Sequence, residues 1–213
     1  MEIFKILSIL LCYPEQELID ALSTIKQKLQ HIEIDTAKVL PLCKHLSETD
    51  LISLQEDYVQ TFDRTPTQSL HLFEHIHGED KMRGQAMVDL LEEYRSENFD
   101  LAGVNELPDY LPLFLEFLSL CEKQKALELL SASIDVIHHI GKKLQANHSI
   151  YASIFTVLIS LSPTSPAPMN SPPVHDMDEA MEKFGYNPEG IEPLLTPNAC
   201  TLCPSQQKKP MEI

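Results

Sequence analysis

The spacing of apolar residues limits the fold of this 213-residue chain more than any other feature. Apolar residues recur at steps of three and four, which match the 3.6 residues of an α-helical turn. The period appears at residues 18–29, 51–62, 87–94, 111–118, 127–144 and 151–158. No alternation of the strand type competes with it. We therefore expect an all-α fold, a single bundle of about seven or eight helices whose apolar stripes pack on one another.

Proline marks the expected end of this bundle. Ten of the fifteen prolines lie between Pro163 and Pro210. A proline inside a helix removes a hydrogen-bond donor and clashes with the preceding turn. We predict a helical domain over residues 1–162 and a Pro-rich, largely disordered tail over residues 163–213, with one short helix at 176–184.

The net charge excludes some classes of partner. Sixteen Lys and Arg residues face 32 Asp and Glu residues, which gives a formal charge of −16. A surface of this sign repels phosphate backbones and anionic lipid, so we expect neither nucleic acid nor a membrane surface as a partner. The same surface attracts a basic peptide. Solubility alone is the other explanation of such a charge.

The apolar N-terminal stretch, residues 1–13, lacks two features of a signal peptide. It has only Lys5 as a basic residue and no small-residue cleavage site, and we interpret it as the first core helix. Elsewhere, polar residues interrupt every apolar run, including 150–161, before the roughly 18 residues that a membrane span requires. The sequence therefore predicts a soluble protein without membrane insertion.

The five cysteines favour a reducing compartment. Cys12, Cys43 and Cys121 sit among apolar residues at helical spacing, where we expect them to act as small core residues of a cytoplasmic protein. Cys200 and Cys203 form a C-x-x-C, which is half of a four-thiolate metal site. No second pair completes it, so we predict no metal centre. A site completed by a second protomer or a partner stays open beside an incidental pair of thiols.

A histidine-rich segment, residues 64–84, lacks a clean apolar stripe. On a helix His71 and His75 would share one face, as two metal ligands must. The zincin order H-E-x-x-H is absent, and Glu74 with His77 gives one Glu-x-x-His unit where di-iron bundles need two and two further glutamates. Hydrogen-bonding or helix-end histidines are the favoured interpretation. A metal-dependent helical enzyme using these four residues is the alternative.

A second irregular segment, residues 98–112, carries Glu106, Asp109 and Tyr110 beside Pro108. Connections placed by a rigid scaffold are where binding residues concentrate. Carboxylates before a helix also act as caps near the positive end of its dipole, and capping is the alternative role here. The chain contains no nucleophile elbow, P-loop or dinucleotide fingerprint, so we expect no enzymatic activity.

Three segments carry a family resemblance: YVQTFDR at residues 58–64, SLHLFEHIHGEDKMRGQAMVDLL at 69–91 and ELPDYLPLFLEFL at 106–118. In these segments the chain resembles the nitrate reductase delta subunit family. This family is the NarJ-type branch of the TorD-like redox-enzyme maturation chaperones. The similarity extends from about residue 7 to residue 161.

The resemblance implies an all-α, TorD-like chaperone that binds the N-terminal segment of the nitrate reductase catalytic (alpha) subunit in the cytoplasm. It implies that this client receives the molybdenum-guanine dinucleotide cofactor while it is held, with molybdenum cofactor delivery proteins as further partners. The chaperone itself would hold no cofactor stably. A generic helical adaptor that binds unrelated partners is the remaining alternative.

A groove for a basic, helix-forming client peptide follows from the resemblance and the acidic composition together. Tyr58 and Phe62 lie one helical turn apart and would line the groove, although aromatic residues at this spacing are often core. Glu106 and Asp109 would form its acidic rim. The predicted peptide-binding residues are Tyr58, Phe62, Glu106, Pro108, Asp109 and Tyr110. A second contact segment would contain His71, His75, His77 and Arg83.

One position departs from the family pattern. The connecting loop of the family usually reads Asp-His, whereas here Asp109 is followed by Tyr110. A role that needs an ionisable imidazole is therefore not carried over to this position. Packing or hydrogen bonding by Tyr110 remains compatible with the pattern.

Overall fold

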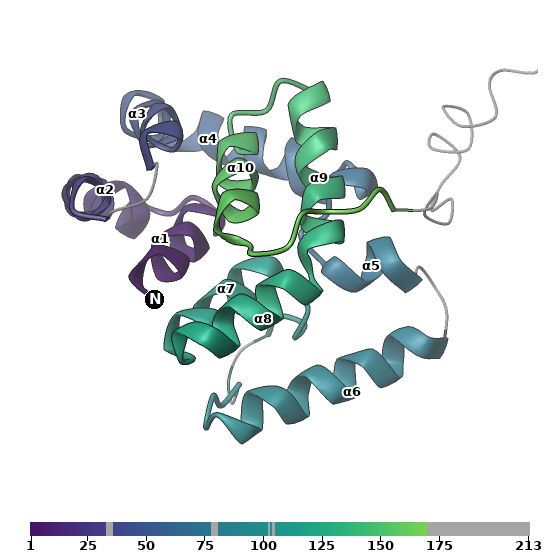
Figure 1. Ribbon diagram of the computed structural model, residues 1–213. Helices are drawn as coiled ribbons and strands as arrows, with labels where there is room; N and C mark the ends of the chain where they lie inside the picture. The colour runs from purple at the N-terminus through teal and green to yellow at the C-terminus, as the bar shows by residue number, and fades with distance from the viewer. Residues whose placement is uncertain (33–35, 78–80, 102, 104, 170–213) are drawn as a thin grey trace, which may run out of the picture. The chain divides into compact units, whose positions relative to one another are not determined.

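Short helices joined by brief connections build the described part of the chain (Figure 1). The computed structural model describes residues 1–169, except residues 33–35, 78–80, 102 and 104. Within them lie ten α-helices, and the predicted all-α class is confirmed. The α-helices are α1 (Glu2–Leu10), α2 (Gln16–Gln30), α3 (Leu40–Glu48), α4 (Leu51–Tyr58), α5 (Leu72–His77), α6 (Lys81–Ser96), α7 (Leu111–Leu120), α8 (Lys123–Ala132), α9 (Ile134–Ala146) and α10 (Ala152–Leu161). Three shorter segments are the 3₁₀ turns η1 (Thr36–Lys38) and η3 (Pro66–Gln68) and the π-turn η2 (Val59–Asp63).

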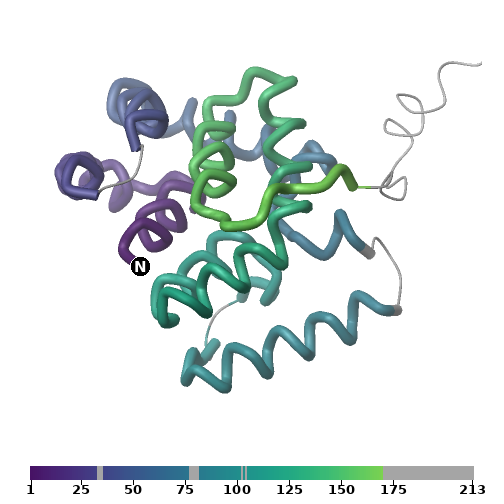
Figure 2. The backbone as a smooth tube through the Cα atoms, viewed as in Figure 1, coloured from purple at the N-terminus to yellow at the C-terminus, as the bar shows by residue number. Residues whose placement is uncertain are grey.

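The described residues contain more helices than the seven or eight predicted, because backbone turns divide the longer periodic stretches. Residues 127–144 carry one apolar period, yet Ser133 adopts φ −102° and ψ 1° between α8 and α9. Helix α8 packs on α7, whereas α9 lies beside α10 (Figure 2). Helix α5 falls in the segment 64–84, where the sequence shows no clean stripe.

Two largely apolar helices, α1 and α7, lie along each other in the core. Both bury residues on more than one face, as a helix enclosed by its neighbours does. The Ser8 hydroxyl donates a hydrogen bond to the Pro112 carbonyl at 2.7 Å, and Lys5 pairs with Glu116. The first predicted helix is therefore a core helix, and it contacts α7, whose first two residues end the irregular segment 98–112.

Two of the three cysteines predicted as core residues are buried. Cys43 is 0% exposed and Cys121 is 6% exposed. Cys12 is exposed, so its predicted core position is wrong. Helix α1 ends at Leu10, and Cys12 therefore no longer follows the buried stripe of that helix.

The start of the predicted tail is described as far as Met169. Helix α10 ends at Leu161, and the Ala167 amide donates a hydrogen bond to the Asp135 carboxylate at 2.7 Å. The chain divides into two units, Met1–His175 and Asp176–Ile213.

Three of our expectations for the tail lie outside the described residues. These are its disorder, the short helix at 176–184, and the C-x-x-C of Cys200 and Cys203. The domain boundary at residue 162 stays a prediction.

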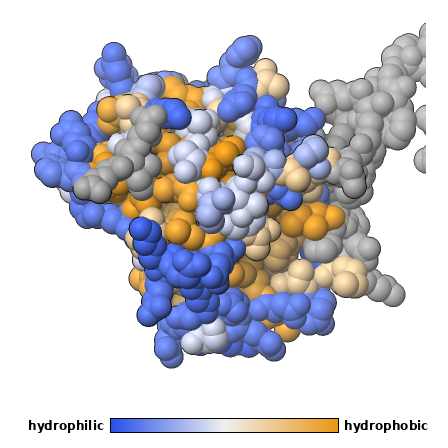
Figure 3. Space-filling model, viewed as in Figure 1, coloured by the Kyte–Doolittle hydropathy of each residue, from blue (hydrophilic) through white to orange (hydrophobic). Residues whose placement is uncertain are grey.

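On the face shown in Figure 3, hydrophobic side chains lie between larger areas of hydrophilic ones. Exposed charged and amide residues cover much of the outer side of α6. Among the described helices, none combines the length and the apolar content that crossing a bilayer would take.

We expect Gly141→Ala to lower the free energy of unfolding by about 1–3 kcal/mol, because it overfills the contact between α9 and α10. An added Cβ atom would lie 2.8 Å from the Cβ atom of Phe155. Helix propensity alone would favour Ala over Gly by up to about 1 kcal/mol, so a loss reports the close approach. Urea denaturation followed by circular dichroism measures it.

Gly84→Ala, in α6, is the matched control. Apart from its chain neighbours and the nearby backbone of α6, no described atom lies within 4 Å of the Cβ atom added there. We expect this substitution to raise the free energy of unfolding by about 0.5–1 kcal/mol. Equal effects of the two substitutions would contradict a special contact at Gly141.

Candidate functional site

An aromatic cluster lies where α4 passes into the π-turn η2. Tyr58 and Phe62 are each 4% exposed, and their ring centroids lie 4.9 Å apart. The ring of Tyr151 packs 5.0 Å from Phe62, and the ring of Tyr13 packs edge-on 5.5 Å from Tyr58. Edge-to-face and offset packing at these distances is favourable beyond the burial of area. Tyr58 and Phe62 are thus core residues, as one interpretation of their spacing predicts.

The same two rings also form one wall of a hollow of about 190 Å³. We call it the aromatic hollow. It is lined by Tyr13, Tyr58, Phe62, Asp63, Ser69, Leu70, His71, Glu106 and Tyr110. Five residues that the sequence predicts as contacts therefore meet here, although they come from three separate segments of the chain.

Tyr110 is held in this hollow by a directed hydrogen bond. The Tyr58 hydroxyl donates its single proton to the Leu11 carbonyl at 2.9 Å. The Tyr110 hydroxyl lies 2.9 Å from the Tyr58 oxygen and must be the donor of that pair. Burial raises the pKa of Tyr110 to about 12, so its hydroxyl stays neutral. Tyr110 thus has the packing and hydrogen-bonding role that remains open for it in place of histidine.

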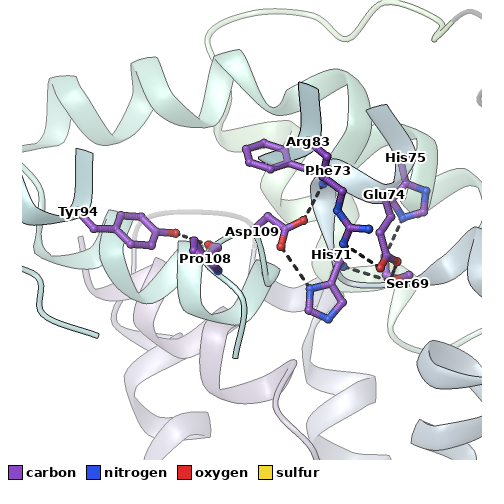
Figure 4. A network of polar contacts seen from close by, with 9 residues as sticks. All are labelled: Ser69, His71, Phe73, Glu74, His75, Arg83, Tyr94, Pro108 and Asp109. Carbon is purple, nitrogen blue, oxygen red and sulfur yellow. Dashed lines mark hydrogen bonds and ion pairs between the residues drawn. The ribbon is translucent and has the colours of Figure 1, made fainter. Parts of the chain in front are cut away.

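Asp109 does not form the acidic rim, and that prediction is wrong. Its side chain is 0% exposed. One carboxylate oxygen accepts a hydrogen bond from the Phe73 amide at 2.9 Å, and the other lies 3.4 Å from His71 Nδ1 (Figure 4). Its backbone carbonyl accepts from the Leu72 amide at 3.1 Å. Asp109 therefore caps α5, whereas the capping alternative placed it at the start of its own helix.

Pro108 is also buried, and its carbonyl accepts a hydrogen bond from the Tyr94 hydroxyl at 2.7 Å. Its predicted place among the peptide contacts is wrong because it lies beneath the surface. Tyr94, at 0% exposed, packs against Phe99 and Phe117 with ring centroids 5.4 Å and 4.5 Å away. Sequence reasoning placed Tyr94 in an apolar period but missed that it fixes the loop.

His71 joins the loop to the segment before α5. Residues 70–72 and 109–111 run antiparallel, with the Leu111 amide donating to the Leu70 carbonyl at 2.8 Å. The His71 side chain is 25% exposed, and its ring lies 5.4 Å from that of Tyr110. The hydrogen bond to Asp109 raises the pKa of His71, and burial opposes this rise only in part.

The predicted second contact segment is mostly structural. His75 is 2% exposed and donates from Nε2 to the Ser69 carbonyl at 2.9 Å, so its predicted peptide contact is wrong. Glu74 accepts from the Ser69 hydroxyl at 2.6 Å and from Arg83 at 3.1 Å. Arg83 thus ties α6 to α5. The side chain of His77 lies outside the described part of the structure.

The metal-dependent enzyme would need these side chains to converge on one point. His71 Nδ1 faces Asp109, His75 Nε2 faces the Ser69 carbonyl, and Glu74 faces Arg83 (Figure 4). Among the described residues, no group of three or more His, Cys, Asp or Glu side chains is placed to hold a metal ion. The geometry therefore favours the interpretation of these residues as hydrogen-bonding groups.

The exposed edge of the aromatic hollow is acidic. Glu106 and Asp63 are both exposed and border it. Neither forms an ion pair with another described residue. Of the two residues predicted for the rim, Glu106 borders this hollow, and its contact with a client stays a prediction. Asp63 is an addition that sequence reasoning missed. Asp63 belongs to the segment 58–64, which carries part of the family resemblance, and that membership could have marked it as a site residue.

A second hollow of about 530 Å³ adjoins the first and shares Tyr13 with it. We call it the outer hollow. Tyr13 is 41% exposed and Ile52 is 69% exposed, which leaves apolar surface beside the carboxylate of Glu56. Sequence reasoning missed both apolar residues. Ile52 is an apolar residue off the buried stripe of α4, and that position could have marked it.

The pairing of His71 with Asp109 should make the free energy of unfolding depend on pH. Because the pKa of His71 is raised above its usual 6.5 in the folded state, its stabilising contribution is complete below pH 6.5 and is lost as the pH rises through the folded value. We expect wild type to exceed His71→Gln in free energy of unfolding by a margin that shrinks as the pH rises. Urea denaturation across this range measures the margin. A margin that grows with pH would contradict this pairing.

Comparison with known proteins places this site in a family. The family model described as nitrate reductase delta subunit matches residues 30–157. The nitrate reductase molybdenum cofactor assembly chaperone NarJ of Escherichia coli K12 is 36% identical over 168 residues, which cover 75% of this chain and 69% of that protein. A NarJ protein of Bacillus subtilis is 32% identical over 74% of this chain and 86% of its own.

A solved structure supports the fold. A protein of Archaeoglobus fulgidus assigned to redox enzyme maturation superposes with a TM-score of 0.57 at 21% identity, covering 74% of this chain and 90% of that one. At this identity the likeness concerns the fold alone, and the expected TorD-like fold is confirmed. On the extent of the family match and the identity to its members, this chain belongs to the nitrate reductase delta subunit family.

Proposed function

We propose that this chain is an assembly chaperone that binds the catalytic subunit of a nitrate reductase through its N-terminal segment and assists insertion of the molybdenum cofactor. Beside membership of the family, one observation on this chain supports the proposal. The exposed ring of Tyr13, backed by the buried rings of Tyr58 and Phe62, lies beside exposed carboxylates of Glu106 and Asp63 in one hollow. Such a surface is suited to holding a polypeptide.

A basic amphipathic helix has the complementary chemistry. Its apolar residues at i, i+3 and i+4 would lie on the rings, and its cations would face the acidic edge. The formal charge of −16 would raise the rate of encounter with a basic segment and disfavour acidic ones. The outer hollow extends the apolar surface past Tyr13, which gives room for more than one turn of the client.

No catalytic step is part of this function. Asp109, His71 and His75 are titratable groups near the hollow, and each uses its polar atoms to hold α5 or the loop. Groups committed in this way position a surface and are poorly placed to exchange protons with a substrate. We infer that the chaperone works in the cytoplasm. The cofactor is cargo of the client, and molybdenum cofactor delivery proteins would approach the complex.

We expect Tyr13→Ala to weaken binding of the client's N-terminal peptide by about tenfold, because an exposed aromatic ring shared by two hollows is placed as an anchor. Isothermal titration calorimetry with the synthetic peptide measures the affinity. Circular dichroism of the variant should match wild type. Undiminished affinity would remove the hollow from the client site.

We expect Glu106→Gln to weaken binding of the same peptide by up to about fivefold, since an exposed charge pair contributes up to about 1 kcal/mol. The difference from wild type should shrink as NaCl is added. Glu92→Gln, on an exposed position of α6, is the matched control for net charge. An equal loss in both variants would mean that only the overall charge matters.

A pull-down separates this function from a generic helical adaptor. The tagged chain should capture the nitrate reductase catalytic subunit from cells that express it before cofactor insertion. Capture of unrelated proteins without that subunit would favour the adaptor.

A further inference from the structure

A third hollow, of about 410 Å³, lies between α4, η3 and the turn that joins α9 to α10. Asp57 and Gln60 line it from α4 and η2, Gln68 from η3, and His148 and Tyr151 from the turn between α9 and α10. We call it the polar hollow. The contacts described for the aromatic hollow do not account for the many polar side chains that line the polar hollow.

Two buried polar groups in this hollow have no hydrogen-bond partner among the residues that the structure describes. Gln68 is 2% exposed, and its side-chain amide forms no hydrogen bond with any described residue. Tyr151 is 4% exposed, and its hydroxyl likewise has no partner in the described part of the chain. A buried polar group without a partner is costly, and native proteins rarely leave one unsatisfied. Two in one hollow therefore indicate a place for hydrogen-bonding atoms from outside the chain.

The charge of the polar hollow selects the kind of atom. Asp57 is exposed and forms no ion pair with a described residue. Lys and Arg are absent from the lining, so an anion would meet no fixed positive charge. Burial raises the pKa of Tyr151, which keeps its hydroxyl neutral and able to accept a hydrogen bond. The lining thus offers a carboxylate, an amide oxygen and a phenol oxygen to a cation.

The polar hollow adjoins the proposed client site through the outer hollow. The outer hollow shares Asp57 and Gln60 with it, and shares Tyr13 with the aromatic hollow. The Tyr151 ring, 5.0 Å from Phe62, belongs to the aromatic cluster and also lines the polar hollow. A segment lying across the outer hollow could therefore place one side chain in the polar hollow.

We propose that the polar hollow binds the guanidinium group of an arginine side chain in the client segment. This assignment rests on the proposed function and names the client residue type that this part of the surface reads. Asp57, Gln68 and Tyr151 offer four oxygen acceptors, which exceed the three donors of a lysine ammonium but suit the five of a guanidinium. Guanidinium is also less strongly hydrated and enters a buried site more readily.

The first experiment uses small probes and no client. N-acetyl-arginine amide is titrated into the isotopically labelled full chain, and amide resonances are followed by NMR. We expect saturable shifts at the Gln68 side chain and at residues 149–151. N-acetyl-citrulline amide has nearly the same shape without the charge and should cause none. Equal shifts with citrulline amide or lysine amide, or shifts elsewhere only, would overturn the assignment.

Substitutions test the acceptors one at a time. Asp57→Asn should weaken binding of arginine amide by about tenfold, because a charge-assisted hydrogen bond is lost. Glu56→Gln is the matched control, since Glu56 lines the outer hollow but not the polar hollow. Tyr151→Phe removes only a hydroxyl and Gln68→Met preserves the length of the side chain, and both should weaken binding. Unchanged affinity in all three acceptor variants would contradict the site.

The client peptide then separates two kinds of failure. We expect Asp57→Asn to weaken its binding by about tenfold, and replacement of its arginines by citrulline to have the same effect. A peptide that binds wild type tightly but is indifferent to both changes would overturn the arginine site and leave the chaperone role standing. A peptide that fails to bind wild type, while arginine amide binds, would overturn the chaperone role and leave the polar hollow as a guanidinium site.

Discussion

The buried carboxylate of Asp109 fixes the geometry on which the candidate site depends. A charge removed from water needs hydrogen-bond donors, and its donors come from the Phe73 amide at the start of α5 and from His71. If the loop at residues 106–110 moved away, the start of α5 would lose its cap and the Asp109 carboxylate would lose its hydrogen-bond donors. Glu106, three residues earlier, is therefore held at the edge of the aromatic hollow although its own side chain is exposed.

Much of the fold is readable from the sequence because burial of one helical face leaves a period of three and four. Tyr58 and Phe62 follow that period, and they are both core residues and walls of a hollow. Asp109 shows where such reading ends. Its amide partner lies 36 residues away in the chain, and local sequence cannot distinguish a cap on a neighbouring helix from an exposed rim. His75 is buried where α5 packs against α9, a long-range contact that local sequence does not reveal either.

Other residues of the site could not be predicted from the sequence, because nothing in their local sequence indicates where they lie in the fold. Tyr13 follows a helix, and its position between two hollows depends on hydrogen bonds from α4 to the residues around it. The Tyr58 hydroxyl donates to the Leu11 carbonyl, and the Gln55 side-chain amide donates to the Pro14 carbonyl. Gln68 is a polar residue in a proline-containing turn, which sequence rules assign to solvent. Its burial arises because η3 packs against α9, a contact between segments more than sixty residues apart. Only the tertiary structure can reveal these placements.

The π-turn η2 explains why three hollows surround one helix. In a regular α-helix, residues after Tyr58 would continue the same faces at 100° per residue. The wider turn, closed by the Arg64 amide on the Val59 carbonyl at 2.9 Å, inserts an extra residue and shifts that phase. Asp63 then borders the aromatic hollow while Arg64 borders the outer one. Single π-turns within helices are rare and often lie at functional sites, and this one lies where the hollows around α4 meet.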